Sequence, residues 1–428
     1  MPLSLLREMP PTAGLPLRAR DLGPAGPRGL AREAARFLGT ETPLLTSSGS
    51  AALVIALAAL AGLSARRKVV VPAFTCPLVP LAVLQAGLEP VVCDTALGSF
   101  ELDRGRLALL LDRETLAVVP THLAGRLADV STVRELAEGV GAWVVEDAAQ
   151  AFGPRQGGEP AGTLGDIGFH SLALGKGLTI FEGGLLHARN PALRRVLAET
   201  AARLARSDST LEALRSLQLL GTSLLYRPSL LPFAYGRPLR RALRRGDLIG
   251  AAADRFDHRI PIHSVGRWRD AVGARAINRL GAHLERSAAV AERLRRRFEG
   301  LGGARILVDA PGDSGTWPAL FFLMPDRASR DAVLARAWAG GIGAGRMFIH
   351  ALPDYPDLRP VLPPAEVPNA RDLAARSLTF GTSPWLGEAE EDAMAEALAG
   401  AARAEGAPHD EEAGADLVAR SAFPPRER

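Results

Sequence analysis

The chain has 428 residues, enough for one large domain or two to three ordinary ones. Its 47% hydrophobic and 23% charged residues are typical of a folded protein, and a net charge of +4 gives no reason to expect nucleic-acid binding. The two cysteines, Cys76 and Cys93, exclude a disulfide scaffold and a cysteine-rich metal site, so we expect no metal and a reducing, cytoplasmic location.

Residues 1–30 are rich in proline, glycine and arginine and predict an extended N-terminal arm. In residues 31–260 we expect a large domain, because short, continuously apolar segments alternate with helical ones. The strand candidates are 68–72, 89–93, 116–120 and 142–146, and the helix candidates are 50–63, 77–87, 103–111 and 130–139. This pattern predicts an α/β fold with a mainly parallel sheet between helices, whose ligands bind at the carboxyl ends of the strands.

Residues 205–260 break this pattern, since they are first apolar, then interrupted by proline, then strongly basic. Two interpretations stay open. The segment is an atypical helical insertion with a solvated basic face, or residues 215–245 make a weak contact with a membrane surface or an anionic, lipid-linked substrate.

Residues 261–404 predict a smaller C-terminal α+β domain that begins with a long connecting helix over 264–300. Its strand candidates are 316–324 and 377–381, and its helix candidates are 327–340 and 387–403. The tail, residues 405–428, has little apolar content and is expected to be disordered.

Two stretches of the large domain combine small or polar residues with an element boundary. In TSSGSAAL, residues 46–53, the N–H groups of Gly49 and Ser50 at a helix start suit a phosphate, although a plain serine cap is the better explanation of this motif taken alone. In VVEDAAQAFG, residues 144–153, Asp147 ends a strand and Gln150 follows three residues later. A helix-capping aspartate is the alternative there.

A third stretch, HSLALGKGLTIFEGG over residues 170–184, places Lys176 between two glycines after a strand that ends at Ser171. Nearly all cationic residues of this chain are arginines, which weakens the interpretation of Lys176 as a surface lysine. A lysine that bonds an aldehyde needs a loop that places its amine over the aldehyde. It also needs surroundings that lower its pKa, so that the neutral amine can attack. A phosphate site, a strand-end carboxylate and such a lysine are together what pyridoxal 5′-phosphate requires.

In order and spacing, these segments resemble the DegT/DnrJ/StrS sugar aminotransferases, a pyridoxal-phosphate family of fold type I. The likeness covers residues 30–190 and, more weakly, 264–300 and 340–403. It implies a seven-stranded sheet and a homodimer with active sites at the subunit interface. It also implies an amino-acid donor, glutamate in our expectation, and a nucleotide-linked keto-sugar acceptor in polysaccharide or glycoconjugate biosynthesis. Pyridoxamine 5′-phosphate would be the intermediate form of the cofactor.

The resemblance also implies roles for single residues. Lys176 matches the Schiff-base lysine, Asp147 the partner of the pyridine nitrogen, and Gln150 a residue near the ring. The phosphate contacts match Gly49, Ser50 and Ser171, and Cys76 stands where an aromatic residue usually stacks on the ring. His122, in PTHLAG, follows the family pattern as either a structural residue or a substrate contact.

The chain departs from the family at three places. Cys76 has no aromatic face, which leaves ring stacking to another group such as Phe74. Gly177 replaces the usual asparagine after the lysine. The segment HRIPIHSVGRW, residues 258–268, lacks the asparagine and arginine that reach the partner subunit's cofactor, and Arg259 or Arg267 are the candidate replacements.

Two other functions stay open beside an aminotransferase. One is different pyridoxal-phosphate chemistry on a sugar or amino acid, although the retained Lys176 argues against the sugar dehydratase relatives, which carry histidine there. The other is a non-catalytic regulator that keeps the fold, which the altered segment 258–268 and the insertion would suit.

Overall fold

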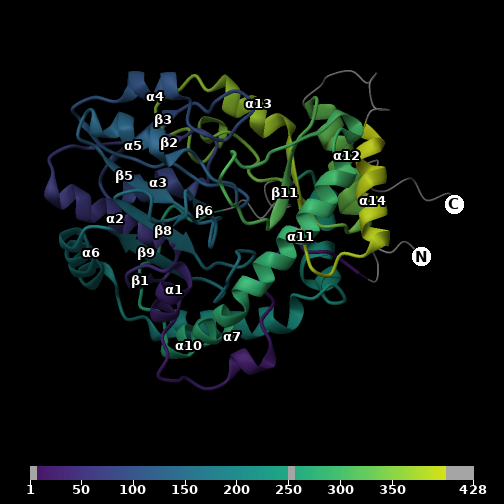
Figure 1. Cartoon of the computed structure of the whole chain (residues 1–428), viewed down its shortest axis with the longest axis horizontal. Coiled ribbons are helices and arrows are strands. Elements are labelled where there is room, and N and C mark those ends of the chain that lie inside the picture. The colour runs from purple at the N-terminus through teal and green to yellow at the C-terminus, as the bar shows by residue number, and fades with distance from the viewer. Residues whose placement is uncertain (1–6, 249–255, 402–428) are drawn as a thin grey trace.

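A seven-stranded sheet forms the centre of the larger part of the molecule (Figure 1). The computed structural model describes residues 7–248 and 256–401. In spatial order the strands are β1 (Leu44–Thr46), β9 (Gly184–Ala188), β8 (Ile167–Ser171), β5 (Trp143–Asp147), β4 (Thr115–Val118), β2 (Lys68–Pro72) and β3 (Glu89–Cys93). The five strands from β8 to β3 pair in parallel, and β9 runs antiparallel to both β1 and β8. The expected mainly parallel sheet is confirmed.

The strands are apolar throughout because helices cover both faces of the sheet. Val69 and Val71 join the core that contains α2 and α3, whereas Val70 between them faces α4 and α5. The helices of this part are α1 (Leu30–Leu38), α2 (Gly49–Leu63), α3 (Leu78–Gln85), α4 (Arg104–Leu110), α5 (Val130–Glu138) and α6 (Pro191–Leu204). A small hairpin, β6 (Arg155–Gln156) and β7 (Glu159–Pro160), follows β5.

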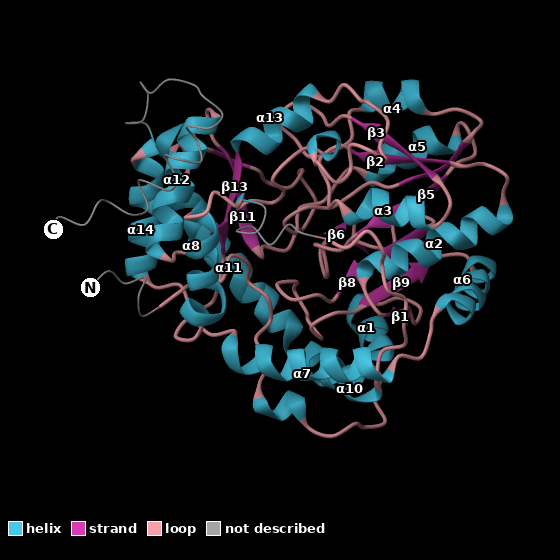
Figure 2. Cartoon of the chain, turned by 180° about the vertical axis from the view of Figure 1, so that it is seen from behind, coloured by secondary structure: helices cyan, strands magenta, loops and turns pink. Residues whose placement is uncertain are grey.

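The segment after α6 is helical in its described part. It consists of α7 (Ser209–Leu225), a π-helical turn (Pro232–Gly236) and α8 (Arg237–Leu243). Residues 249–255 of the predicted insertion lie outside the described residues. Figure 2 shows α7 beside α10 (Arg267–Ala276), below the sheet.

The long helix expected over 264–300 is instead two helices. The α10 helix ends in a tighter turn, Ile277–Arg279, from which α11 (Leu280–Phe298) leaves in a new direction (Figure 1). Arg279 of this turn forms an ion pair with Asp21 of the N-terminal segment. A continuous Ala/Arg/Leu pattern in the sequence cannot predict such a contact between distant parts of the chain.

The smaller sheet is antiparallel, with spatial order β10, β11, β13, β12. These strands are β10 (Arg305–Ile306), β11 (Ala319–Leu323), β12 (Ala344–Gly345) and β13 (Ser377–Gly381), and the accompanying helices are α12 (Arg327–Gly340), α13 (Pro368–Arg376) and α14 (Glu388–Ala399). The sequence had predicted both long strands and the helices α12 and α14. The tail from 402 onward, expected to be disordered, lies outside the described residues.

The N-terminal segment packs into the molecule where it is described. Met9 pairs with Ile342 beside the small sheet, and the Leu15 N–H donates to the carbonyl of Gly177 at 3.0 Å. Both Met9 and Leu15 are buried. No helix within the described ranges is long and apolar enough to cross a membrane.

Candidate active site

Lys176 lies in a loop that connects β8 to the antiparallel strand β9. The loop turns at Gly175, whose φ of +83° is unfavourable for residues with a Cβ, and it is closed by the Leu174 N–H, which donates to the Phe181 carbonyl at 3.0 Å. The Lys176 side chain is half-buried. Burial lowers the pKa of Lys176, while Cys76 and Asp147 oppose this shift through their charges. The amine therefore lies in the kind of environment that favours its neutral form.

Asp147 ends β5, beside β8, and is almost completely buried. One carboxylate oxygen accepts a hydrogen bond from the Ala149 N–H at 2.9 Å. Burial raises the pKa of Asp147 to about 6, although the Ala149 N–H and the charge of Lys176 lower it. A cationic ring nitrogen against this carboxylate would favour its charged form.

The residues predicted to bind a phosphate meet at the start of α2. A Cβ added to Gly49 would lie 3.0 Å from the Cβ of Ser171, so the two backbones approach closely. Ser48 is the N-cap and accepts a hydrogen bond from the Ala51 N–H. The N–H groups of Gly49 and Ser50 are in the first turn, where a helix supplies no internal acceptor. The cap and the phosphate site, alternatives in the sequence, are thus compatible.

A cavity of about 700 Å³ opens beside Lys176. Gln150 lines it and accepts a hydrogen bond from the Ala124 N–H at 3.0 Å, which fixes the orientation of its amide. Many of its other lining residues come from the segment after α6: Gln218, Gly221, Thr222, Leu225, Tyr226, Leu231, Ala234 and Tyr235. The segment that breaks the sequence pattern therefore helps to form the candidate site.

His122 is fully buried and both of its ring nitrogens are engaged by the protein. Nδ1 accepts from the Ala128 N–H at 2.9 Å, and Nε2 lies 2.8 Å from a carboxylate oxygen of Glu146. Glu146 also accepts the N–H groups of Gly162, Leu164 and Gly165. These contacts leave no ring nitrogen of His122 for a substrate, and they favour the structural one of its two predicted roles.

Cys76 lies close enough to Lys176 for its charge to act on the amine, but it offers no aromatic face. Phe74, the substitute considered from the sequence, is fully buried and packs edge-on against Phe348 with ring centroids 5.2 Å apart. Phe74 therefore does not present its ring to the cavity that holds Lys176.

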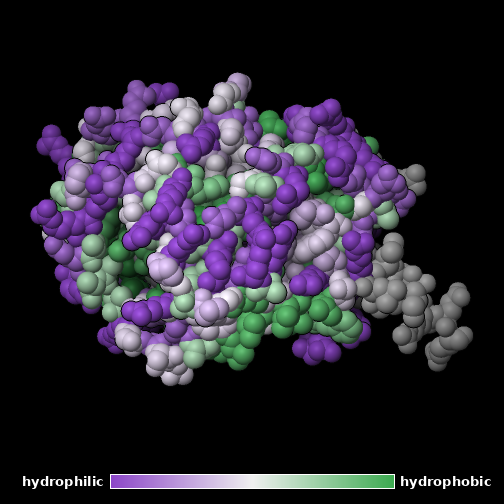
Figure 3. Space-filling model, turned by 60° about the horizontal axis from the view of Figure 1, so that its bottom comes forward, coloured by the Kyte–Doolittle hydropathy of each residue, from purple (hydrophilic) through white to green (hydrophobic). Residues whose placement is uncertain are grey.

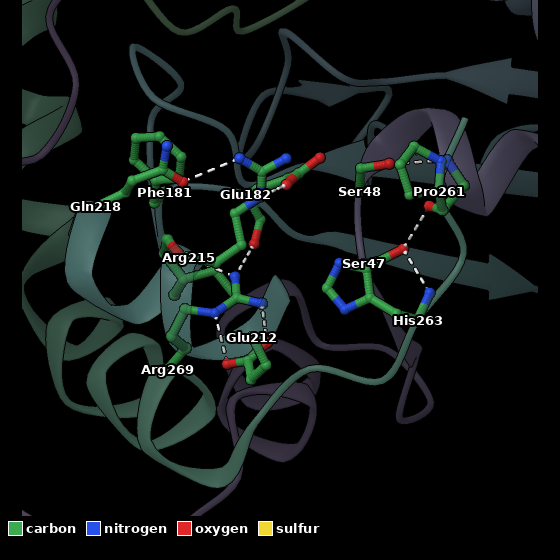
Figure 4. A network of polar contacts seen from close by, with 12 residues as sticks. Ser47, Ser48, Phe181, Glu182, Glu212, Arg215, Gln218, Pro261, His263 and Arg269 are labelled. Carbon is green, nitrogen blue, oxygen red and sulfur yellow. Dashed lines mark hydrogen bonds and ion pairs between the residues drawn. The ribbon is translucent and has the colours of Figure 1, made fainter. Parts of the chain in front are cut away.

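An ion-pair network that the sequence did not indicate anchors the Lys176 loop (Figure 4). Arg269 of α10 is fully buried, pairs with Glu212 of α7 and donates to the backbone carbonyls of Ile180 and Glu182. Arg215 of α7 pairs with the Glu182 side chain. Nothing in a single sequence marks these arginines among so many others, since the network joins three separate parts of the chain: α7, α10 and the Lys176 loop.

Pro261 and His263 of the altered segment 258–268 lie beside Ser47 of the same chain (Figure 4). Ser47, next to the α2 start, donates to the Pro261 carbonyl at 3.1 Å and accepts the His263 N–H at 3.4 Å. Arg259 and Arg267 are exposed.

The described residues fit pyridoxal phosphate. A lysine with a lowered pKa lies near a buried strand-end carboxylate, and a small-residue helix start lies next to Ser171. Fold and site together define the class of fold type I pyridoxal-phosphate enzymes. A family model of the DegT/DnrJ/EryC1/StrS aminotransferase family matches residues 23–210 and 268–399, and the chain belongs to this family. The aminotransferases of this family depend on pyridoxal phosphate.

Named relatives align over part of their length. The GDP-perosamine synthase of Caulobacter vibrioides is 33% identical over 36% of this chain and 41% of its own length. A UDP-N-acetyl-3-dehydro-alpha-D-glucosamine 3-aminotransferase of Acidithiobacillus ferrooxidans is 34% identical over 40% of this chain and 46% of its own length. These matches span less than half of the curated relatives.

Solved structures of low identity share the fold over most of the chain. A putative sugar aminotransferase of Streptococcus pneumoniae in its PMP form has a TM-score of 0.70 at 17% identity, over 91% of this chain and 98% of its own. DesV of S. venezuelae, in complex with a ketimine intermediate, has a TM-score of 0.67 at 24% identity, over 92% and 91%.

Proposed function

We propose that this protein is a pyridoxal-phosphate-dependent aminotransferase that moves an amino group from an amino acid, in our expectation glutamate, to a nucleotide-linked keto sugar. The observation that carries the proposal is the approach of Lys176 to Asp147 at the carboxyl edge of the sheet, with opposite shifts of their pKa values. The names of the partial relatives support a sugar as the acceptor.

When bound, pyridoxal phosphate supplies an electron sink that lets an amino group leave one substrate and join another. Lys176 would hold the cofactor through its amine, and Nζ would later take the proton from the α-carbon of the donor. Asp147 would keep the ring nitrogen charged, and Gly49, Ser50 and Ser171 would bind the phosphate. Gln150 would lie at the ring, and Cys76 would border it without stacking.

The test is turnover of the purified protein with L-glutamate and GDP- or UDP-linked 4-keto or 3-keto sugars, with mass detection of the amino sugar. Lys176→Ala is expected to lose turnover by at least about a thousandfold, because it removes both the anchor and the base. Lys68→Ala is the matched control, since Lys68 is the other lysine of the sequence and pairs with Asp112 at the surface. Full turnover of Lys176→Ala would contradict the assignment.

We further propose that the active form is a homodimer. The support is an apolar face along α7 and the turn after it, within the face shown in Figure 3. The α7 face, as we call it, consists of Leu214, Leu217, Leu220, Leu224, Leu225, Leu230 and Phe233, each at least 38% exposed. So large a group of exposed leucines is typical of an interaction surface. Leu225 also lines the Lys176 cavity, so a subunit seated on this face would border the site.

A further inference from the structure

A second cavity, of about 660 Å³, lies directly beside the first. The two share the residues Leu174 and Gly175 of the Lys176 loop and Thr222 and Tyr226 of the segment around the end of α7. The Lys176 loop and the end of α7 therefore form a wall that is common to both cavities.

The second cavity is lined by positive charge. Its walls contain five arginines and no aspartate or glutamate: Arg7, Arg18, Arg227, Arg279 and Arg286. Arg7 pairs with Glu390 and Arg279 with Asp21. Within residues 7–248 and 256–401, the other three arginines have no ion-pair partner. The cavity therefore carries positive charge that the described protein does not neutralise.

The cationic groups of this cavity act on one another. Burial lowers the pKa of Arg279, Asp21 opposes the shift, and Arg18 adds to it. Burial also lowers the pKa of His283, another wall residue, and the charges of Arg286 and Arg279 lower it further. Nε of Arg279 is buried and has no hydrogen-bond partner. An anion in the cavity would relieve this repulsion and give the guanidinium groups acceptors.

Most of these arginines lie outside the stretches that match the family model. Arg7 and Arg18 precede the first stretch that matches the family model, and Arg227 lies in the gap between the two matched stretches. Only Arg279 and Arg286 lie within a matched stretch. The positive charge is thus supplied largely by the N-terminal segment and by the segment after α7.

We propose that this arginine-lined cavity binds the diphosphate group of the acceptor, while the keto sugar reaches past Leu174 and Gly175 to Lys176. The inference rests on the proposed function for the nature of the acceptor. Guanidinium groups suit phosphate oxygens because their planar fork donates two parallel hydrogen bonds.

The test is calorimetric titration of the full chain, saturated with pyridoxal phosphate so that the cofactor's own phosphate site is filled. Inorganic pyrophosphate and GDP or UDP are the probes. The wild type is expected to bind them, more weakly as salt rises. Arg18→Ala combined with Arg286→Ala should raise Kd about tenfold or more, since two charge-assisted contacts are lost. Arg32→Ala, which removes an exposed arginine of α1 outside the cavity, should leave Kd unchanged.

Two results would overturn the diphosphate site: no binding of either probe by the wild type, or equal Kd values for the double variant and the wild type. If the double variant is unstable, Arg227→Glu asks the same question at an exposed position. These failures differ from failure of the proposed function. A wild type that takes no amino group from any donor contradicts the aminotransferase assignment, whatever its affinity for pyrophosphate.

Discussion

Glu146 and Asp147 are adjacent carboxylates at the end of β5 with opposite environments. Successive strand residues point to opposite faces of the sheet. Glu146 is held by His122 and backbone N–H groups, and these outweigh burial and lower its pKa. Asp147 accepts one hydrogen bond from the Ala149 N–H, and burial raises its pKa to about 6. The carboxylate with few protein donors is the one available to a cationic ligand.

Replacing Asp147 by asparagine is expected to stabilise the cofactor-free protein while abolishing cofactor chemistry. The pKa of Asp147 rises from 3.8 to about 6 on folding, so above pH 6 the folded state carries a buried charge that water would solvate better. Its removal should increase the free energy of unfolding by roughly 2–3 kcal/mol at pH 8. Because protonation discharges the group, the gain should shrink as pH falls from 6 toward 4.

Urea unfolding of the cofactor-free wild type and Asp147→Asn across this pH range measures the difference. A variant that is less stable than the wild type at pH 8, or a gain that grows toward low pH, would contradict the assigned environment of Asp147. Turnover of the variant with cofactor should be lower by orders of magnitude.

At the residue scale, the sequence predicted where single residues stand relative to neighbouring helices and strands. Asp147 and Gly49 stand at element ends and Lys176 in the loop after β8, and the fold brings these parts together at one edge of the sheet. The role of His122 depends on Glu146 and the 162–165 backbone, which only the fold brings into contact. For the same reason the sequence could not show that Phe74 points into the core.

At the element scale, the Lys176 loop is fixed by two helices that lie outside the sheet. Arg269→Met would leave Glu212 without its partner and two loop carbonyls without a donor. Removing one member of a buried ion pair costs about 3 kcal/mol or more, so we expect that loss in the free energy of unfolding. We also expect a lower kcat, because Lys176 would be held less firmly.

Arg296→Ala is the control, because Arg296 pairs with Glu292 one turn away on the exposed face of α11. Such pairs contribute about 0.5 kcal/mol or less. Equal losses in the two variants, measured by denaturant unfolding, would show that the Arg269 network does not anchor the loop.

Elements with a strong local pattern were predicted within a few residues, for example β13 and α12. Short strands such as β1 and β12 were missed because three or two residues carry too little pattern. The break between α10 and α11 was missed because the Ala/Arg/Leu pattern continues through it, and contacts at the break such as the pairing of Arg279 with Asp21 join distant parts of the chain.

At the scale of the whole molecule, the α7 face tests the proposed dimer. The double variant Leu217→Glu, Leu224→Glu places two charges on this face. Leu217 and Leu224 are 66% and 57% exposed, more than the other leucines of the face. We expect a dimer for the wild type and a monomer for this variant in light scattering. Leu97→Glu, at a leucine 79% exposed outside this face, should remain a dimer. A monomeric wild type that binds anionic vesicles would instead favour the membrane interpretation of residues 215–245.

The central claim is that Lys176 carries the cofactor and releases it to an amino donor. Borohydride reduction of the holoprotein, followed by peptide mass spectrometry, tests it directly, because Lys68 and Lys176 are the only lysines of the sequence. We predict a phosphopyridoxyl group on Lys176 and none on Lys68, and loss of that label when L-glutamate or another amino donor is added before reduction. Labelling of Lys68 alone, no labelling, or labelling of Lys176 that no amino donor diminishes would contradict the account.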